Sequence, residues 1–112
     1  MVRKVPLNES PQIVDINKMK QPITKQQVMN YIMIARRTRE YVKFMLGNSY
    51  IMVQFHRDGS VNLLSNIRFE SAFQRELYRL DSIGFSISSW GYFIAYWLNK
   101  FKQREHINNK RT

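Results

Sequence analysis

The sequence predicts a small single α+β domain in the order helix, β-hairpin, helix, helix, with a flexible N-terminal arm and a basic C-terminal tail. Apolar residues recur at helical spacing on both sides of residues 50–65, and Asp58-Gly59 separates two short runs of strand-forming residues. The chain has 112 residues, of which 44% are hydrophobic, so it can fill one core. We place the arm at 1–21, the compact domain at 22–105 and the tail at 106–112. The arm is interpreted either as mobile or as an extended, strand-like lead.

The first predicted helix spans about residues 24–46. Thr24 is a good N-cap, and Gln27 stands three residues later, where a capping box needs it. Gly47-Asn48 offers the left-handed conformation that ends many helices. The apolar positions near helical spacing are Val28, Ile32, Ala35, Val42 and Met45.

The hairpin is predicted over 50–56 and 60–65, because both segments are rich in β-branched, aromatic and aliphatic residues. Asp58-Gly59 is typical of a type I′ turn, in which both central residues take positive φ.

Two helices are expected after the hairpin. Asn66 is expected to cap the first of these helices, which ends at Ile83-Gly84. Ser86 or Ser88 is expected to cap the second, which runs to about residue 104. Each helix has one apolar stripe, and we expect the two stripes to pack together. The stripes are Phe69, Phe73, Leu77 and Leu80, and Trp90, Phe93, Ile94, Trp97 and Phe101.

Residues 82–98 carry no charge, which raises the question of a membrane segment. The window is shorter than the roughly 20 apolar residues of a spanning helix, and it includes four serines and two glycines. A buried helix is therefore favoured. Binding at a membrane surface stays an alternative, because aromatic residues are followed by positive ones.

The net charge of +10 favours a polyanionic partner. Residues 48–98 are neutral, with four cations and four acids, whereas residues 99–112 hold five cations and one acid. Basic ends thus flank a neutral middle.

Several classes of site are not expected. The chain has no cysteine, only two histidines and no phosphate-binding glycine loop, so we predict no metal site, no cofactor and no enzyme activity. A small RNase that uses Arg, Lys and Tyr would be the hardest class of enzyme to recognise from the sequence. His56-Arg57-Asp58 matches the letters of a kinase catalytic loop by accident, because the other kinase motifs are missing. No signal peptide is visible, and we expect a cytoplasmic protein.

The main candidate site is the cluster of cations on the first predicted helix. Like charges four residues apart, such as Arg39 and Lys43, slightly destabilise a helix, so a polyanion would explain them. A solvated helix face is the alternative. The members of this cluster are Arg36, Arg37, Arg39 and Lys43.

Two further groups of cations are candidates. Arg57 lies near the hairpin tip, and a two-stranded ribbon fits the DNA major groove. Lys100, Lys102 and Arg104 near the chain's C-terminus are expected to contact phosphates. Tyr92 and Tyr96 lie away from the apolar stripe of the last helix, where they can stack on bases. The alternative is that they fill the margin of the core with their hydroxyls in water.

Residues 66–98 resemble a ribbon–helix–helix repressor subunit. The likeness rests on Asn66-Ile67-Arg68-Phe69 before one helix and on Gly84-Phe85-Ser86-Ile87-Ser88-Ser89 before the next. The resemblance implies that Asn66 and Arg68 read base edges from a dimer. The chain departs from that family in its preceding helix and strand, and in Gly91, where a core aliphatic residue is usual.

These observations lead us to expect a basic, non-catalytic nucleic-acid-binding accessory or regulatory protein, with DNA favoured over RNA and duplex slightly over single strand. The alternative is a small protein-binding module or inhibitor that docks on an acidic face of a larger protein. A homodimer is an alternative to a monomer. The frequent use of Lys, Asn and Ile is in keeping with a mobile-element or phage source.

Overall fold

The computed structural model describes the backbone of residues 12–111 and the side chains of residues 12–104. It is a mixed α+β domain built on a four-stranded sheet, so the predicted helix–hairpin–helix–helix order is wrong. The elements in order are β1 (Gln12–Asp15), the 3-10 helix η2 (Ile16–Lys18), α1 (Lys25–Thr38), β2 (Tyr41–Leu46), β3 (Ser49–Phe55), β4 (Val61–Ser65), α2 (Ser71–Ile83) and α3 (Ile87–Arg111).

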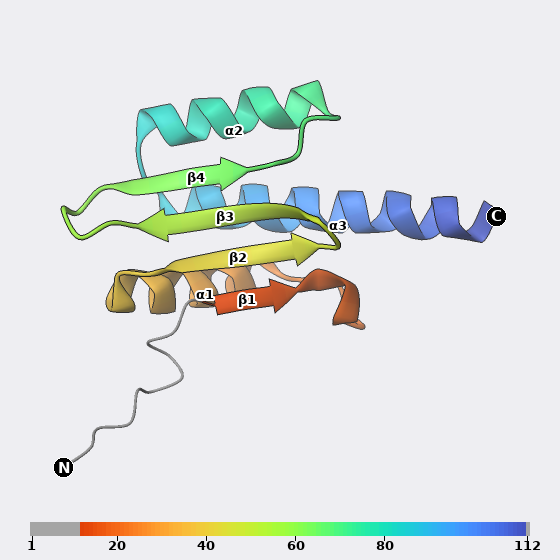
Figure 1. Cartoon of the computed structure of the whole chain (residues 1–112), viewed down its shortest axis with the longest axis horizontal. Coiled ribbons are helices and arrows are strands. Elements are labelled where there is room, and N and C mark those ends of the chain that lie inside the picture. The colour runs from red at the N-terminus through yellow and green to blue at the C-terminus, as the bar shows by residue number, and fades with distance from the viewer. Residues whose placement is uncertain (1–11, 112) are drawn as a thin grey trace, which may run out of the picture.

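The strands lie in sequence order across the sheet. β1 pairs in parallel with β2, and α1 is the crossover between them, whereas β2, β3 and β4 are antiparallel neighbours. Figure 1 shows α1 and α3 on one face of the sheet and α2 beside β4. No helix within residues 12–111 covers the other face.

The first helix is shorter than predicted. Its capping box at Thr24 and Gln27 is confirmed, but Arg39 adopts the left-handed conformation (φ 56°) and ends the helix eight residues before Gly47. From Tyr41 onward the side chains alternate between half-buried and fully buried, which is the period of a strand. Pairing with β3 buries Val42, Phe44 and Leu46 together. A helix cannot place three alternate residues on one face, so residues 41–46 form a strand and not the end of a helix.

Part of the predicted N-terminal arm is an extended strand, as the second interpretation of residues 1–21 expected, and is not a flexible segment. Residues 12–18 form β1 and η2, and Val14 and Ile16 are buried in the core. Residues 1–11 and 112 lie outside the described residues. At the other end, α3 continues to Arg111, past the predicted end near residue 104.

The hairpin of β3 and β4 is confirmed, although its turn differs from the type I′ turn predicted. Only Gly59 has positive φ (94°), and the His56 N–H donates to the Ser60 carbonyl at 2.9 Å. The loop is therefore the three-residue kind, in which a glycine in the left-handed region follows a turn.

The second predicted helix begins later than expected. Glu70, not Asn66, precedes α2, and Phe69 lies outside the helix with 67% of its surface exposed. Ser86 does begin α3, where its hydroxyl accepts from the Ser89 N–H at 3.3 Å.

The aromatic stripe of α3 is confirmed as core. Trp90, Phe93 and Ile94 are fully or almost fully buried, and Phe73 of α2 stacks on Phe93 with ring centroids 5.3 Å apart. Gly91 lets α3 approach α1 closely, because a Cβ at this position would lie 2.7 Å from Cγ of Met29. Within residues 12–111 no helix has an apolar stretch long enough to cross a bilayer.

Candidate nucleic-acid interface

The cations predicted to share the first helix are divided between a helix and the sheet. Arg36 and Arg37 lie in the last turn of α1 and Arg39 is its C-cap, but Lys43 lies on β2. The expectation that all four cations lie on the first helix is therefore wrong. Lys43 is on the open face of the sheet, with Nζ 4.7 Å from the ring centre of Tyr50 and 5.9 Å from that of Tyr41.

Arg36 and Arg39 meet His56 at the end of the sheet where the β3–β4 hairpin turns. One guanidinium nitrogen of Arg39 donates to the Arg57 carbonyl at 3.1 Å, and the guanidinium of Arg36 lies 5.8 Å from the ring centre of Phe85. Together these side chains line a cleft of about 310 Å³, which we call the hairpin-end cleft. Arg37 is exposed but lies outside the lining.

Two of the three cations of α3 whose side chains the structure describes are bonded to the protein itself. Lys102 donates to the main-chain carbonyls of Ile16 and Met19 and so holds η2 against α3. Arg104 donates to a carboxylate oxygen of Glu70 at 2.9 Å, and this bond is the main reason that the pKa of Glu70 is lowered. Two of the three predicted phosphate contacts thus have partners within the fold.

Lys100 lies over two aromatic rings, whereas Arg104 lies over that of Phe101 alone. Its ammonium nitrogen is 5.5 Å from the ring centre of Tyr96 and 5.1 Å from that of Trp97. It also lies 3.4 Å from the Tyr96 hydroxyl.

The two predicted base readers also have internal partners. Asn66 accepts from the Tyr50 N–H and donates to the Asn48 carbonyl, both at 2.8 Å, so its amide joins β3 to the start of the β4–α2 connection. Arg68 donates to the carbonyls of Ser65 and Ile67. Both residues follow the end of β4, so neither lies on a reading strand of the kind that the repressor resemblance implied.

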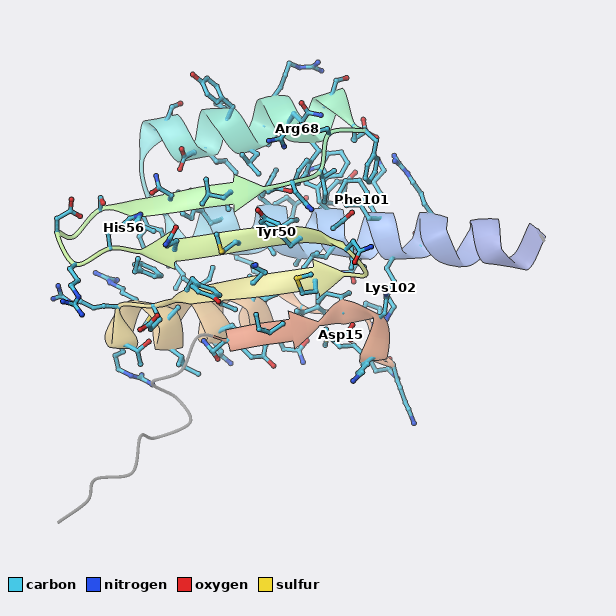
Figure 2. The ribbon with its side chains drawn as sticks, viewed as in Figure 1. Asp15, Tyr50, His56, Arg68, Phe101 and Lys102 are labelled. Carbon is cyan, nitrogen blue, oxygen red and sulfur yellow. The ribbon has the colours of Figure 1, made fainter. Side chains whose placement is uncertain are left out.

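The cations do not converge on one surface. Figure 2 shows His56 at one end of the sheet and Arg68 and Lys102 at the other. The hairpin-end cleft and the C-terminal half of α3 therefore cannot contact one compact stretch of phosphates.

A wide groove of about 940 Å³ between α2 and α3 gathers a different set of side chains, which we call the tyrosine groove. Tyr92 and Tyr96 are 62% and 45% exposed, and their rings lie nearly parallel, at 18° with centroids 6.2 Å apart. The cations that line the groove are Lys25, Arg75 and Arg79.

One carboxylate, that of Glu76, also lines the groove. It pairs with Arg79 at 2.7 Å, which lowers the pKa of Glu76 and raises that of Arg79. No carboxylate of the described side chains lies within ion-pair distance of Lys25 or Arg75. The groove thus combines exposed aromatic rings with an excess of positive charge.

The sequence indicated the two tyrosines as candidate base contacts but not the cations beside them. Arg75 and Arg79 fall in the stretch whose charges sum to zero, and a sum along the chain cannot show that they share a helix face four residues apart. Lys25 belongs to α1, and only the tertiary fold brings it to this groove.

No family model matches the chain, and no curated protein or solved structure shows a significant match to it. The described part of the chain holds no group of three or more His, Asp or Glu residues that is arranged to bind a metal ion.

Proposed function

We propose that this protein binds single-stranded nucleic acid in the tyrosine groove and catalyses no reaction there. The observation that carries the proposal is the pair of exposed, nearly parallel rings of Tyr92 and Tyr96 in a groove lined by Lys25 and Arg75. Bases stack on aromatic rings with about 1–3 kcal/mol each, and cations along the groove meet the phosphates. The protein would then serve as an accessory or regulatory factor in the cytoplasm.

The groove favours a single strand over a duplex, because unpaired bases expose the faces that stack on tyrosine. DNA and RNA share these faces and their phosphates, so oligomers of both belong in the test. DNA is our first expectation. The salt dependence of binding should report the phosphate contacts, with a slope of about 0.7 per contact for single strands.

The test is a fluorescence anisotropy titration of short single-stranded and duplex oligonucleotides with the whole chain. We expect Tyr92→Ala and Tyr96→Ala each to weaken single-strand binding about 5- to 150-fold, the loss of one stacked base. Tyr92→Trp should retain binding, because the ring is kept.

Tyr78 is the matched control. It is a tyrosine on α2 with 76% of its surface exposed, and it does not line the groove. Tyr78→Ala should bind like the natural chain. Absence of binding at low salt, or an equal loss in Tyr78→Ala and Tyr92→Ala, would refute the proposal.

A second candidate is a protein-binding module, and the specific observation for it is the sheet face that no helix of residues 12–111 covers. Lys43 lies there between Tyr41 and Tyr50, beside half-buried Met45 and Met52. Tyrosine and methionine are enriched at protein interfaces, and the lysine suits an acidic partner.

A second copy of the chain is another possible occupant of this face. Sedimentation of the natural chain and of Met52→Glu distinguishes it: a dimer that dissociates in the variant supports self-association through the sheet. If the natural chain and Met52→Glu are both monomers, an acidic protein is the remaining candidate for this face. Lys43→Glu should then abolish binding of that protein without changing oligonucleotide affinity.

A further inference from the structure

We propose that the hairpin-end cleft binds a phosphate monoester. Arg36, Arg39 and His56 line it together, and no carboxylate of the described residues belongs to its lining. Three nitrogen-bearing side chains that converge on one small cleft make an anion site. This site is separate from the tyrosine groove and uses none of the residues assigned to it.

Arg39 is held in place for this role. Its left-handed backbone fixes the start of the side chain, and one guanidinium nitrogen donates to the Arg57 carbonyl. A guanidinium has five N–H donors, so this bond leaves others to meet an anion. Ordering before binding lowers the entropy cost of association.

Arg36 and His56 are oriented by their neighbours as well. The guanidinium of Arg36 lies over the Phe85 ring, which restrains it while its edge stays available to oxygen acceptors. One ring nitrogen of His56 lies 2.6 Å from the Asn62 amide oxygen, and this contact leaves the second nitrogen for another partner.

Two acids are next to lining residues in sequence, and neither lines the cleft: Glu40 follows Arg39, and Asp58 precedes Gly59 and is turned toward its own loop. Its carboxylate accepts from the Ser60 N–H at 2.9 Å and from the Ser60 hydroxyl at 2.7 Å, and these bonds lower its pKa. Asp58 therefore stays ionised in its own turn and does not line the cleft.

A monoester suits the cleft better than a carboxylate or a chain phosphodiester. Its charge at neutral pH is close to −2, which matches two fixed guanidinium groups, and its three terminal oxygens can accept from several donors at once. The volume of about 310 Å³ admits such a group, and Phe55, Val61 and Phe85 form the apolar part of the lining.

The phosphate can come from a nucleic-acid end or from a small free molecule. Phe85 lines the cleft while Ile83 and Ser88 line the tyrosine groove, so only the short α2–α3 connection lies between the two. A strand in the groove would bring its terminal phosphate near the cleft. This first source rests on the proposed function, whereas the second does not.

The direct test is a titration of the whole chain with inorganic phosphate, followed by the backbone amide NMR signals. We expect saturable shifts at Gly59 and Val61 and none at Tyr92 or Tyr96. Arg36→Gln and Arg39→Gln should each weaken binding at least tenfold.

Arg37→Gln is the control, because Arg37 is equally exposed in the same helical turn and lies outside the cleft. It should leave the affinity for phosphate within about twofold of the natural value, as expected for a surface substitution. Shifts that do not saturate, or the same loss in Arg37→Gln and Arg36→Gln, would overturn the site.

Oligonucleotides with and without a 5′-phosphate identify the source. Tighter binding of the phosphorylated strand, lost in Arg36→Gln, supports a strand end. Equal binding of the two strands together with a positive inorganic phosphate titration supports a small free phosphate. The two proposals fail separately, because inorganic phosphate tests the cleft without a strand and Tyr92→Ala tests the groove without a terminal phosphate.

Discussion

Arg36 and Arg39 in the hairpin-end cleft differ from Lys102 and Arg104 on α3 in what surrounds them. Arg36 and Arg39 face a cleft without carboxylates, and Arg39 uses only one described donor contact, to the Arg57 carbonyl. Lys102 and Arg104 instead donate to carbonyls and to a carboxylate of the same chain. Positive charge close together in the sequence is therefore not by itself a binding surface.

The difference follows from position in the fold. The second half of α3 passes η2 and the start of α2, whose carbonyls and Glu70 need donors. The end of α1 passes the hairpin tip and the aromatic ring of Phe85, where fewer acceptors compete for the guanidinium groups. We expect Lys102 and Arg104 to stabilise the protein, and Arg36 and Arg39 to bind an anion.

The largest expected effect is that of Lys102→Met. The change removes the ammonium donor from both carbonyls; that of Ile16 still accepts from the Met19 N–H, whereas that of Met19 is left without a described donor. An unsatisfied buried polar group costs about 1–3 kcal/mol. We expect urea denaturation to show a free energy of unfolding lower by about 2 kcal/mol, with oligonucleotide affinity unchanged. A variant of natural stability that binds nucleic acid more weakly would place Lys102 among the binding cations instead.

Asn66→Ala should have the next largest effect, on stability. It removes the bonds to the Tyr50 N–H and to the Asn48 carbonyl, worth together about 1–2 kcal/mol. Asn30→Ala is the control, because Asn30 is exposed and bonds only the Gln26 side chain among its described partners. Weakened sequence discrimination in Asn66→Ala at natural stability would restore its predicted role as a base reader.

A pair of arginine variants compares the groove with α3 directly. Arg75 lines the tyrosine groove, whereas Arg104 pairs with Glu70. We expect Arg75→Gln to make the salt dependence of oligonucleotide binding less steep by about 0.7, the value for one phosphate contact. Arg104→Gln should leave the slope unchanged, and an equal change in both would mean that the ion pair opens to bind nucleic acid.

Glu70→Gln should give the smallest effect, on the pH dependence of stability. The hydrogen bond from Arg104 holds the pKa of Glu70 below its ordinary value of 4.5. The stabilisation is therefore complete above that value and is lost as the pH falls through the lowered pKa. Thermal unfolding should show the natural chain slightly more stable than Glu70→Gln at pH 7 and equal to it in strong acid. A difference that persists in acid would contradict this assignment.

Several local features were predictable from the sequence because they depend on neighbours along the chain. The capping box at Thr24, the hairpin around Gly59 and the buried stripe from Trp90 to Phe101 are all present. Each rests on spacing or on turn chemistry that acts over a few residues.

The strand β2 and the groove were not predictable in the same way. The residues of Tyr41–Leu46 are compatible with a helix or with a strand. The segment forms a strand because β1 and β3 supply its backbone hydrogen bonds. The partners of the candidate site residues were not predictable either, because they are distant in sequence. Ile16 lies 86 residues from Lys102, and Glu70 lies 34 residues from Arg104.

The sequence by itself determined the mixed α+β class, the basic charge, the hairpin and the aromatic core of the last helix, because short-range spacing and composition are enough for these. The tertiary structure alone decided that residues 12–15 and 41–46 complete a sheet, that the cations separate into engaged and available sets, and that Tyr92 and Tyr96 share a groove with Lys25 and Arg75. The physical reason is that hydrogen-bond partners and neighbouring charges are set by distances in space, and the fold brings together segments that lie far apart along the chain.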